Sequence, residues 1–145
     1  MILKKMAISA DHAGFELKEA LKAHFAGRVE WVDLGTGSTQ SVSYVDYGKV
    51  MGLAIEKGEV ASGIVICGSG IGISIAANRN KAVRAALCAD ATMARLARLH
   101  NDANVLALGA RIIGFQVAVD CVEAFLNTEF EGGRHADRVA ALREC

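Results

Sequence analysis

The chain has 145 residues, of which 52% are hydrophobic and 22% are charged. A single core usually spans roughly 100–200 residues, and a chain of ~150 residues removes about 70% of its unfolded surface from water, so one domain is expected. Sixteen Lys and Arg residues balance sixteen Asp and Glu residues. A net charge of zero provides no long-range attraction to a phosphate backbone or an anionic membrane. We therefore expect one domain over residues 1–145, with no nucleic-acid or membrane partner.

The four cysteines lie far apart, and no pair has the two-residue spacing of a zinc knuckle or a redox dithiol. No signal-peptide pattern opens the chain, so a reducing cytoplasm is the expected compartment. Residues 60–78 carry no charge, but the glycines within this stretch break it into a strand, a loop and the start of a helix. A transmembrane helix is not expected there.

Short apolar runs alternate with longer segments of helical period, which is typical of repeated βα units around a parallel sheet. Strands are expected at 6–9, 29–33, 63–67, 85–88 and 105–108. Helices are expected at 15–25, 44–57, 71–78, 92–100, 115–127 and 136–143. In the first helix, the apolar side chains predict a core-facing stripe, with Lys18, Glu19 and Lys22 on the opposite, polar face.

Five strands with right-handed crossovers predict a three-layer, doubly wound (Rossmann-like) α/β sandwich in the order 2-1-3-4-5, plus a C-terminal helix. Ligands of such sheets bind outside the carboxyl ends of the strands, at the point where the strand order reverses. Residues 11–14 and 67–72 follow the two strands that flank this point. The sequence therefore predicts a ligand site between these two segments.

The segment 67–72 reads Cys-Gly-Ser-Gly-Ile-Gly between an apolar strand and a helix. Backbone amides at such a helix start can point at an anion or oxyanion. The segment lacks the third glycine of a dinucleotide fingerprint and the Lys of a Walker loop. Cys67 lies where a helix N-terminus stabilises a thiolate, which makes it a candidate base or nucleophile. A buried, inert cysteine is the structural alternative, and it explains Cys88 and Cys121 better.

Three other groups carry candidate chemistry, each with a structural alternative. Asp11 and His12 can offer an acceptor and an imidazole to the same crevice, or Asp11 can simply cap a helix. His100 can act in a site or only complement the helix C-terminus. Arg134 and Arg138 are four residues apart, so both can grip a phosphate or form a solvated face. The histidines and cysteines do not have metal-ligand spacing, so no metal site and no cofactor are expected.

Taken together, these motifs resemble the ribose-5-phosphate isomerase type B family, which also contains galactose-6-phosphate isomerase subunits and allose-6-phosphate isomerases. The resemblance covers essentially the whole chain in order and spacing. The segments that carry it are 9–15, 67–72, 76–78, 84–88, 100–105, 108–111 and 130–135.

The resemblance implies a metal-free aldose–ketose isomerase that works through an enediolate. Cys67 matches the family's general base, which moves a proton between C1 and C2 of an open-chain sugar phosphate. The amides of Gly68, Gly70 and Gly72 and the hydroxyl of Ser69 would stabilise the oxyanion. His100, with Asp11, matches the position that assists opening of the furanose ring.

The resemblance also implies the substrate contacts and the assembly. Asn101 would hold the sugar, and Tyr44 would line the site. The phosphate ligands would be His12, Arg111, Arg134 and Arg138. Because the family's site is built from two subunits, a homodimer or a dimer of dimers is implied.

The sequence departs from the family pattern at several positions. Ser69 stands where many members have Thr, and Ile73 stands where a subgroup without the cysteine has a Glu base, so this chain resembles the cysteine type. Val45 replaces a common proline, and Ala82 a frequent glycine. The expected substrate is ribose 5-phosphate. The alternatives are a four- or six-carbon sugar phosphate, a non-catalytic subunit that binds a phosphorylated metabolite, or an inactive partner subunit of a hetero-oligomer.

Overall fold

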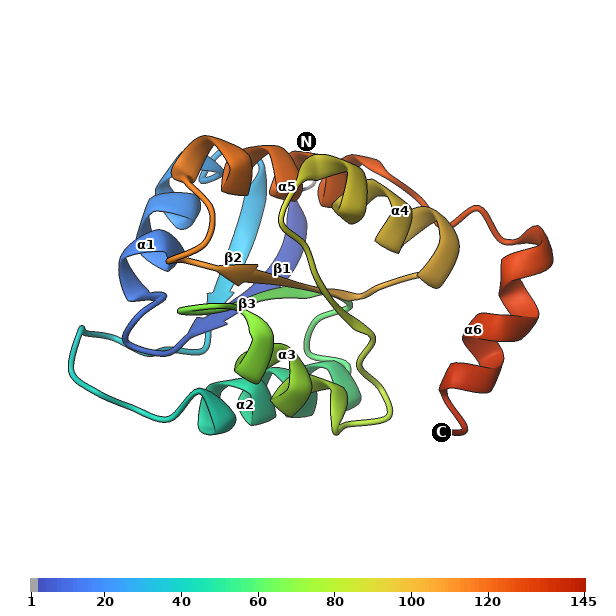
Figure 1. Ribbon diagram of the computed structural model, residues 1–145, viewed down its shortest axis with the longest axis horizontal. Helices are drawn as coiled ribbons and strands as arrows, with labels where there is room; N and C mark the ends of the chain where they lie inside the picture. Colours follow the sequence, from blue (N-terminus) through green and yellow to red (C-terminus); the bar gives the residue numbers. More distant parts are fainter. Residues whose placement is uncertain (1–2) are drawn as a thin grey trace.

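The computed structural model describes residues 3–145, which form an α/β fold on a five-stranded parallel sheet (Figure 1). The strands are β1 (Lys4–Ala10), β2 (Val29–Asp33), β3 (Gly63–Cys67), β4 (Ala85–Leu87) and β5 (Val105–Gly109). β3 pairs with β1 on one side and with β5 on the other, and Cys67 at its end is in register with Gly109. The carboxyl ends of the three central strands, β1, β3 and β5, therefore lie side by side at one end of the sheet.

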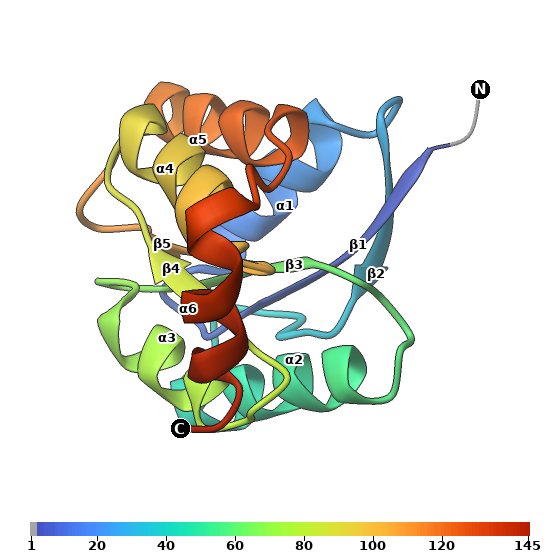
Figure 2. The ribbon, with the colours of Figure 1, turned by 90° about the vertical axis from the view of Figure 1, so that its right-hand side faces the viewer.

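The helices cover both faces of this sheet, as Figure 2 shows. Helices α1 (Phe15–His24), α4 (Ala91–Asn101) and α5 (Phe115–Asn127) lie on one face. Helices α2 (Tyr44–Glu56) and α3 (Ile71–Asn78) lie on the other. The 3₁₀ turn η1 (Gly133–His135) and helix α6 (Ala136–Leu142) follow. The expected elements and the three-layer parallel architecture are thus confirmed.

The core consists of two apolar layers, one on each face of the sheet. On the first face Ile8 packs in a cluster with Phe25 of the turn after α1 and Phe125 of α5. On the second face Val65 packs in a cluster with Met51 of α2. Every residue of β3 and β5 is buried, because helices cover both faces of the parallel sheet. This explains why these strands are continuous apolar runs in the sequence.

The expected strand order 2-1-3-4-5 is wrong, because the observed order is β2-β1-β3-β5-β4. β5 is buried along its whole length, whereas β4 is three residues long and only half-buried. The more apolar strand therefore takes the interior position beside β3, and the short one forms the edge. As a result, the sheet has a point of strand-order reversal on each side of β3, one between β3 and β1 and the other between β3 and β5. Helix α3 leaves β3 toward one face, while α1 and α5 leave its neighbours toward the other.

The prediction that Lys18 lies on the polar face of the first helix is also wrong. Its side chain is only 1% exposed, and its Nζ lies 2.6 Å from Oδ2 of Asp33 and 2.8 Å from Oε2 of Glu19. Lys22 also pairs with Asp33, at 2.6 Å. Burial alone would raise the pKa of Asp33, but hydrogen bonds from Lys18 and Lys22 lower it below its usual value. The helical period could not show this burial, because Asp33 comes from β2.

We expect Asp33→Ala to lower the free energy of unfolding by about 2–3 kcal/mol, because it removes a partner from a buried ammonium group. Lys18→Met should cost less than about 1 kcal/mol, since it removes the buried charge itself. Because the pKa of Asp33 is lowered in the folded state, its contribution is present at neutral pH and is lost as the pH falls through the acid range. Urea denaturation at pH 7 and pH 4 measures all three effects. A larger loss for Lys18→Met than for Asp33→Ala would contradict this account.

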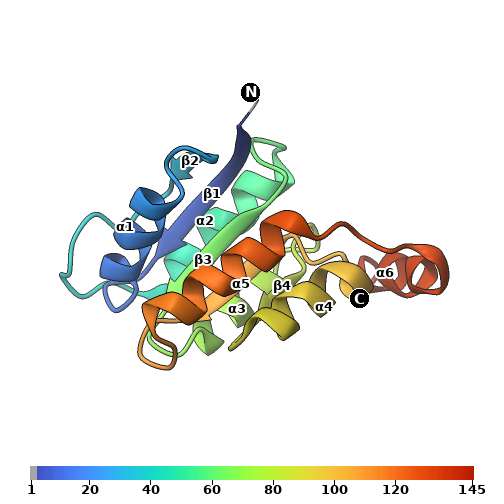
Figure 3. The same ribbon diagram turned by 90° about the horizontal axis from the view of Figure 1, so that it is seen from above.

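Helix α6 stands apart from the three layers, at the end of the molecule where the strands begin (Figures 1 and 3). Gly132 and Gly133, with φ of +72° and +55°, reverse the chain before it. Val139 is the one buried side chain of α6. None of the helices formed by residues 3–145 is both long and apolar enough to cross a membrane.

Candidate active site

A cleft of about 610 Å³ opens at the carboxyl edge of the sheet, where the strand order reverses on both sides of β3. Its polar lining comes from the ends of β1, β3 and β5 and from the start of α2. The lining residues are Asp11, Tyr44, Cys67, Gly68, Ser69, Ile71, Gly72, Ile75, Arg111 and Ile112. The ligand site expected between residues 11–14 and 67–72 thus coincides with a real cleft, which the rearranged strand order extends to the end of β5.

Cys67 ends β3 at the inner wall of this cleft and is 4% exposed. Its Sγ accepts a hydrogen bond from the amide of Gly70 at 3.2 Å, at the N-terminus of α3. This hydrogen bond places the sulfur at the N-terminal end of α3, beside the amides of the loop. Cys67 is therefore a buried cysteine, as the structural alternative stated, but it is one that faces a ligand cleft.

The other cysteines have no such setting. Burial raises the pKa of Cys88 to about 12 and that of Cys121 to about 11. Both lie in the apolar layer under α4 and α5, which agrees with their interpretation as inert core residues. Cys145 is exposed at the C-terminus.

The turn after β1 is organised by Asp11, which is 6% exposed. Its Oδ1 accepts hydrogen bonds from the amides of Ala13 and Gly14 at 3.0 and 3.2 Å. Both hydrogen bonds lie in the turn before α1. The N-cap of α1 is Gly14 and the helix has no side-chain cap, so the alternative that Asp11 simply caps a helix is wrong. Because Asp11 also lines the cleft, the same carboxylate shapes the turn and faces the site.

Two glycines allow the loop after β3 to approach its neighbours. Gly70 has a φ of +78°, and a Cβ on it would lie 2.5 Å from Leu87 and 2.8 Å from the backbone of Leu108. A Cβ on Gly72 would lie 2.5 Å from the Tyr44 ring. Ser69 completes the loop, and its Oγ accepts the amide hydrogen of Ile71 at 3.2 Å. The hydroxyl hydrogen of Ser69 remains available to a ligand.

Arg111 brings positive charge to the same cleft from the end of β5. Its Nη1 would lie 3.4 Å from a Cβ on Gly68, so the guanidinium lies against the loop that carries Cys67. Within residues 3–145 it forms no ion pair. His12 is tied to the neighbouring loop instead, because its Nδ1 lies 3.1 Å from the amide nitrogen of Val42. His12 does not line the cleft.

The remaining expected site residues lie at the other end of the molecule. His100 and Asn101 end α4, which leads into the amino end of β5. Arg134 lies in η1 and Arg138 in α6, both exposed and without an ion pair in the part of the chain that the structure describes. The structure therefore splits the expected site. In one chain, Cys67 and Arg111 lie at the carboxyl ends of the strands. His100, Arg134 and Arg138 lie beyond the amino ends of the strands.

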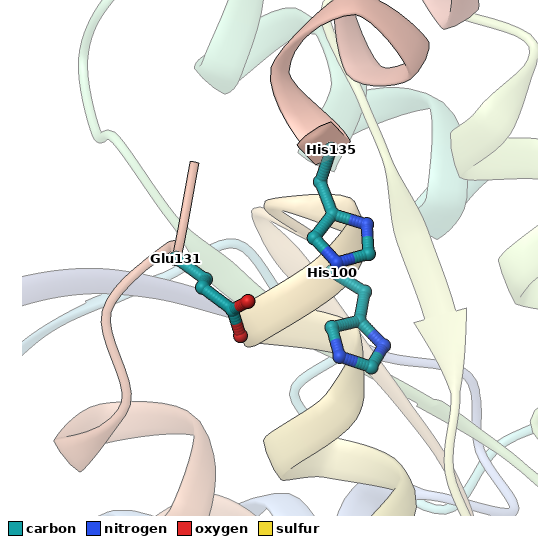
Figure 4. Close-up of side chains that lie close together, drawn as sticks. All are labelled: His100, Glu131 and His135. Carbon is teal, nitrogen blue, oxygen red and sulfur yellow. The ribbon is translucent and has the colours of Figure 1, made fainter. Parts of the chain in front are cut away.

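The sequence analysis missed two residues that accompany His100, namely His135 and Glu131 (Figure 4). The His135 ring stacks on that of His100, with centroids 4.4 Å apart. Burial is the main cause that lowers the pKa of His135, and the charges of His100 and Arg134 lower it further. The pair of glycines before Arg134 was the available signal, because such a turn can fold the following residues back onto an earlier helix. The apolar rim of Ile71, Ile75 and Ile112 was also not anticipated.

The cleft offers a thiol beside backbone amides and a guanidinium, while the opposite end offers an imidazole and two guanidinium groups. A thiol and amides in this arrangement suit abstraction of a proton next to a carbonyl group, with the negative charge received by the amides. The arginines suit a phosphate group. Among the residues that the structure describes, the cleft lining contains no imidazole, and the group at the opposite end contains no thiol.

The comparisons with known proteins agree on one family. Residues 6–142 match the model of the family described as Ribose/Galactose Isomerase. The chain is 47% identical over 141 residues to the Escherichia coli ribose-5-phosphate isomerase B, covering 97% of this chain and 95% of that protein. It also superposes on the solved Thermotoga maritima ribose 5-phosphate isomerase with a TM-score of 0.95 at 49% identity, covering 98% and 99% of the two chains. The Clostridium thermocellum ribose-5-phosphate isomerase B gives 0.94 at 48% identity, covering 97% and 95%.

Proposed function

The chain belongs to the ribose/galactose isomerase family, and from this premise we propose that it interconverts D-ribose 5-phosphate and D-ribulose 5-phosphate. The observation that carries the proposal is the cleft at the end of β3, where Cys67 lies at the inner wall and Arg111 lies against the same loop. The identity to relatives named for this activity extends over nearly the whole chain. The substrate is an aldose phosphate with a removable proton on C2.

In the proposed reaction the thiolate of Cys67 removes the C2 proton of the open-chain aldose. The C2–H electron pair forms the C1–C2 double bond, and the negative charge moves to the oxygen on C1. This gives an enediolate, in which the proton of the C2 hydroxyl passes to the oxygen on C1. The C2 oxygen then forms the new carbonyl group while the electron pair of the C1–C2 double bond takes the proton from the same thiol at C1, which gives the ketose. The loop amides and the Ser69 hydroxyl would receive the oxygen that gains charge. The hydrogen bond from Gly70 to Sγ keeps the sulfur at the start of α3, beside these donors.

We infer that the complete site forms between two copies of this chain. His100 assists ring opening and Arg134 and Arg138 bind phosphate in the proposed mechanism, yet they lie beyond the edge of the sheet opposite Cys67. In a two-fold dimer the Cys67 edge of each protomer can face the His100 end of its partner, which produces two equivalent sites. The position of α6, apart from the three layers, supports this arrangement.

We expect Arg134→Ala to raise the KM for ribose 5-phosphate by roughly 10–100-fold with a smaller effect on kcat, because a charge-assisted hydrogen bond to phosphate is lost. Arg95→Ala is the matched control, since Arg95 is also exposed but lies on α4. Inorganic phosphate should inhibit the Arg134 variant less than the unmodified protein. An unchanged KM together with unchanged phosphate inhibition would remove Arg134 from the phosphate site.

The function is tested by ketose formation from four-, five- and six-carbon aldose phosphates with the purified chain. Ribose 5-phosphate should be the preferred substrate. Preference for another chain length would retain the mechanism but replace the substrate. Binding of sugar phosphates without turnover would favour a non-catalytic subunit, and activity only after addition of a related chain would favour a hetero-oligomer.

A further inference from the structure

The side chains of His100, Glu131 and His135 form a cluster at the end of α4 (Figure 4). One potential ligand atom from each lies within 4.8 Å of the other two. The histidines come from α4 and η1, and the glutamate comes from the segment between α5 and η1. This cluster consequently could not be found from residue spacing.

The backbone fixes the three residues close together. The amide of Glu131 donates to the carbonyl oxygen of Leu99 at 3.1 Å, and Nε of Arg98 donates to the carbonyl oxygen of Thr128 at 3.0 Å. These contacts hold the segment before η1 alongside the end of α4. The amide of His135 then donates to the carbonyl oxygen of Gly132 at 3.1 Å, within the turn that returns the chain to His100.

His135 also has an unsatisfied polar atom. The residue is 7% exposed, and its Nε2 is buried without a hydrogen-bond partner. Buried polar atoms of native proteins are nearly always paired, so an unpaired imidazole nitrogen needs an explanation. Within residues 3–145, the side chains of His100 and Glu131 likewise have no hydrogen-bond partner, so all three groups are available to one ligand.

We propose that His100, Glu131 and His135 form a binding site for a divalent transition-metal ion such as Zn²⁺. Two imidazoles and one carboxylate are a donor set that suits zinc, cobalt or nickel better than magnesium or calcium. A water molecule or a substrate oxygen would complete a tetrahedron. A metal ion bound here occupies the imidazole of His100, which opens the sugar ring in the proposed mechanism. The ion therefore acts as a reversible inhibitor of the isomerase. This consequence rests on the proposed isomerase function, whereas the metal site itself does not.

Small side-chain movements are sufficient to form the site. Ligand atoms bound to Zn²⁺ at about 2.0–2.1 Å in a tetrahedron lie roughly 3.3 Å apart, so the present separations must shorten by about 1.5 Å or less. The stacked rings must also turn so that one nitrogen of each faces the ion. His100 is half-buried and Glu131 is exposed, so both can rotate toward the buried His135. Arg134 and Arg138 add positive charge nearby, so weaker binding is expected than at a closed four-ligand zinc site.

Calorimetric titration with Zn²⁺ and absorption spectra with Co²⁺ test the site directly. We expect one ion per chain, with visible Co²⁺ bands and no intense thiolate charge-transfer band. Glu131→Gln and His135→Asn should each weaken binding at least about tenfold. Glu129→Gln and His24→Asn are matched controls that should bind normally. Glu131 is exposed, so its replacement should not disturb folding. If His135→Asn does not fold, Glu131→Gln alone tests whether the cluster binds the metal.

The metal site would be overturned if no ion bound stoichiometrically, or if binding survived in both ligand variants. Loss of binding in Cys67→Ser with a thiolate band in the unmodified protein would also overturn it, since the ion would then sit on the sulfur. The inhibition is measured separately by titrating Zn²⁺ into the isomerase assay, where Glu131→Gln should need at least about tenfold more metal. Binding without inhibition would retain the metal site and contradict the role of His100 in the proposed function.

Discussion

Replacement of Cys67 by alanine is expected to lower kcat by on the order of 10²–10⁴-fold, the usual contribution of a general base. Removing the sulfur leaves other hydrogen bonds of the loop in place, because the carbonyl oxygen of Gly70 accepts from the Ser74 amide at 3.2 Å and that of Gly68 accepts from the Arg111 amide at 2.9 Å. The phosphate ligands are other residues, so binding of a phosphorylated substrate analogue should change little. Steady-state turnover of ribose 5-phosphate, together with calorimetric titration of a non-reacting sugar phosphate, measures both quantities.

Cys145→Ala is the matched control for this variant. Cys145 is exposed at the C-terminus, and its Sγ donates to the carbonyl oxygen of Ala141 at 3.6 Å. Turnover should therefore be unchanged. Near-normal turnover in Cys67→Ala would mean that another group removes the proton, and the mechanism would then be wrong.

The second large effect is a recovery of activity when two inactive variants are combined. Cys67→Ala and His100→Ala should each lose at least about 10²-fold in turnover. In a hybrid dimer, the intact Cys67 edge of one protomer meets the intact His100 end of the other. Random pairing makes half of the dimers hybrid, with one intact site in each, so about a quarter of normal activity should return. Refolding an equal mixture of the two variants and measuring turnover tests this.

The control mixture combines Cys67→Ala with Ser69→Ala. Both changes lie on the same loop after β3, so every site in a hybrid dimer still lacks one of these residues and no activity should return. Equal recovery of activity in both mixtures would mean that the recovery does not come from a site shared between protomers. No recovery in either mixture, despite proven hybrid formation, would contradict a site shared between protomers.

Much of the fold follows from local sequence patterns. The apolar run 63–67 followed by glycines predicted β3, the turn and the start of α3, because strand, loop and helix start are each determined by neighbouring residues. This also located Cys67 at the carboxyl edge of the sheet. The positions of Asp11 and Arg111 followed in the same way from the ends of β1 and β5.

The features that were missed depend on contacts between distant segments. β5 lies between β3 and β4 because the more apolar strand gains more from an interior position, a comparison that the linear pattern of elements does not contain. Lys18 is buried because Asp33 of β2 meets it. The sequence singled out His100 as a candidate, but its separation from Cys67 depends on the end of the sheet at which α4 finishes. Its neighbours His135 and Glu131 depend on the turn at Gly132.

The central claim, that Cys67 moves a proton between C2 and C1 of a sugar phosphate, is tested most directly by isotope exchange. Ribose 5-phosphate is incubated with the purified chain in D₂O containing a chelator, and deuterium at C1 and C2 is followed by NMR. We predict ketose formation with deuterium entering both carbons, and neither product nor exchange above background with Cys67→Ala. Exchange at the normal rate in Cys67→Ala, or no reaction of the folded, unmodified protein, would contradict the account.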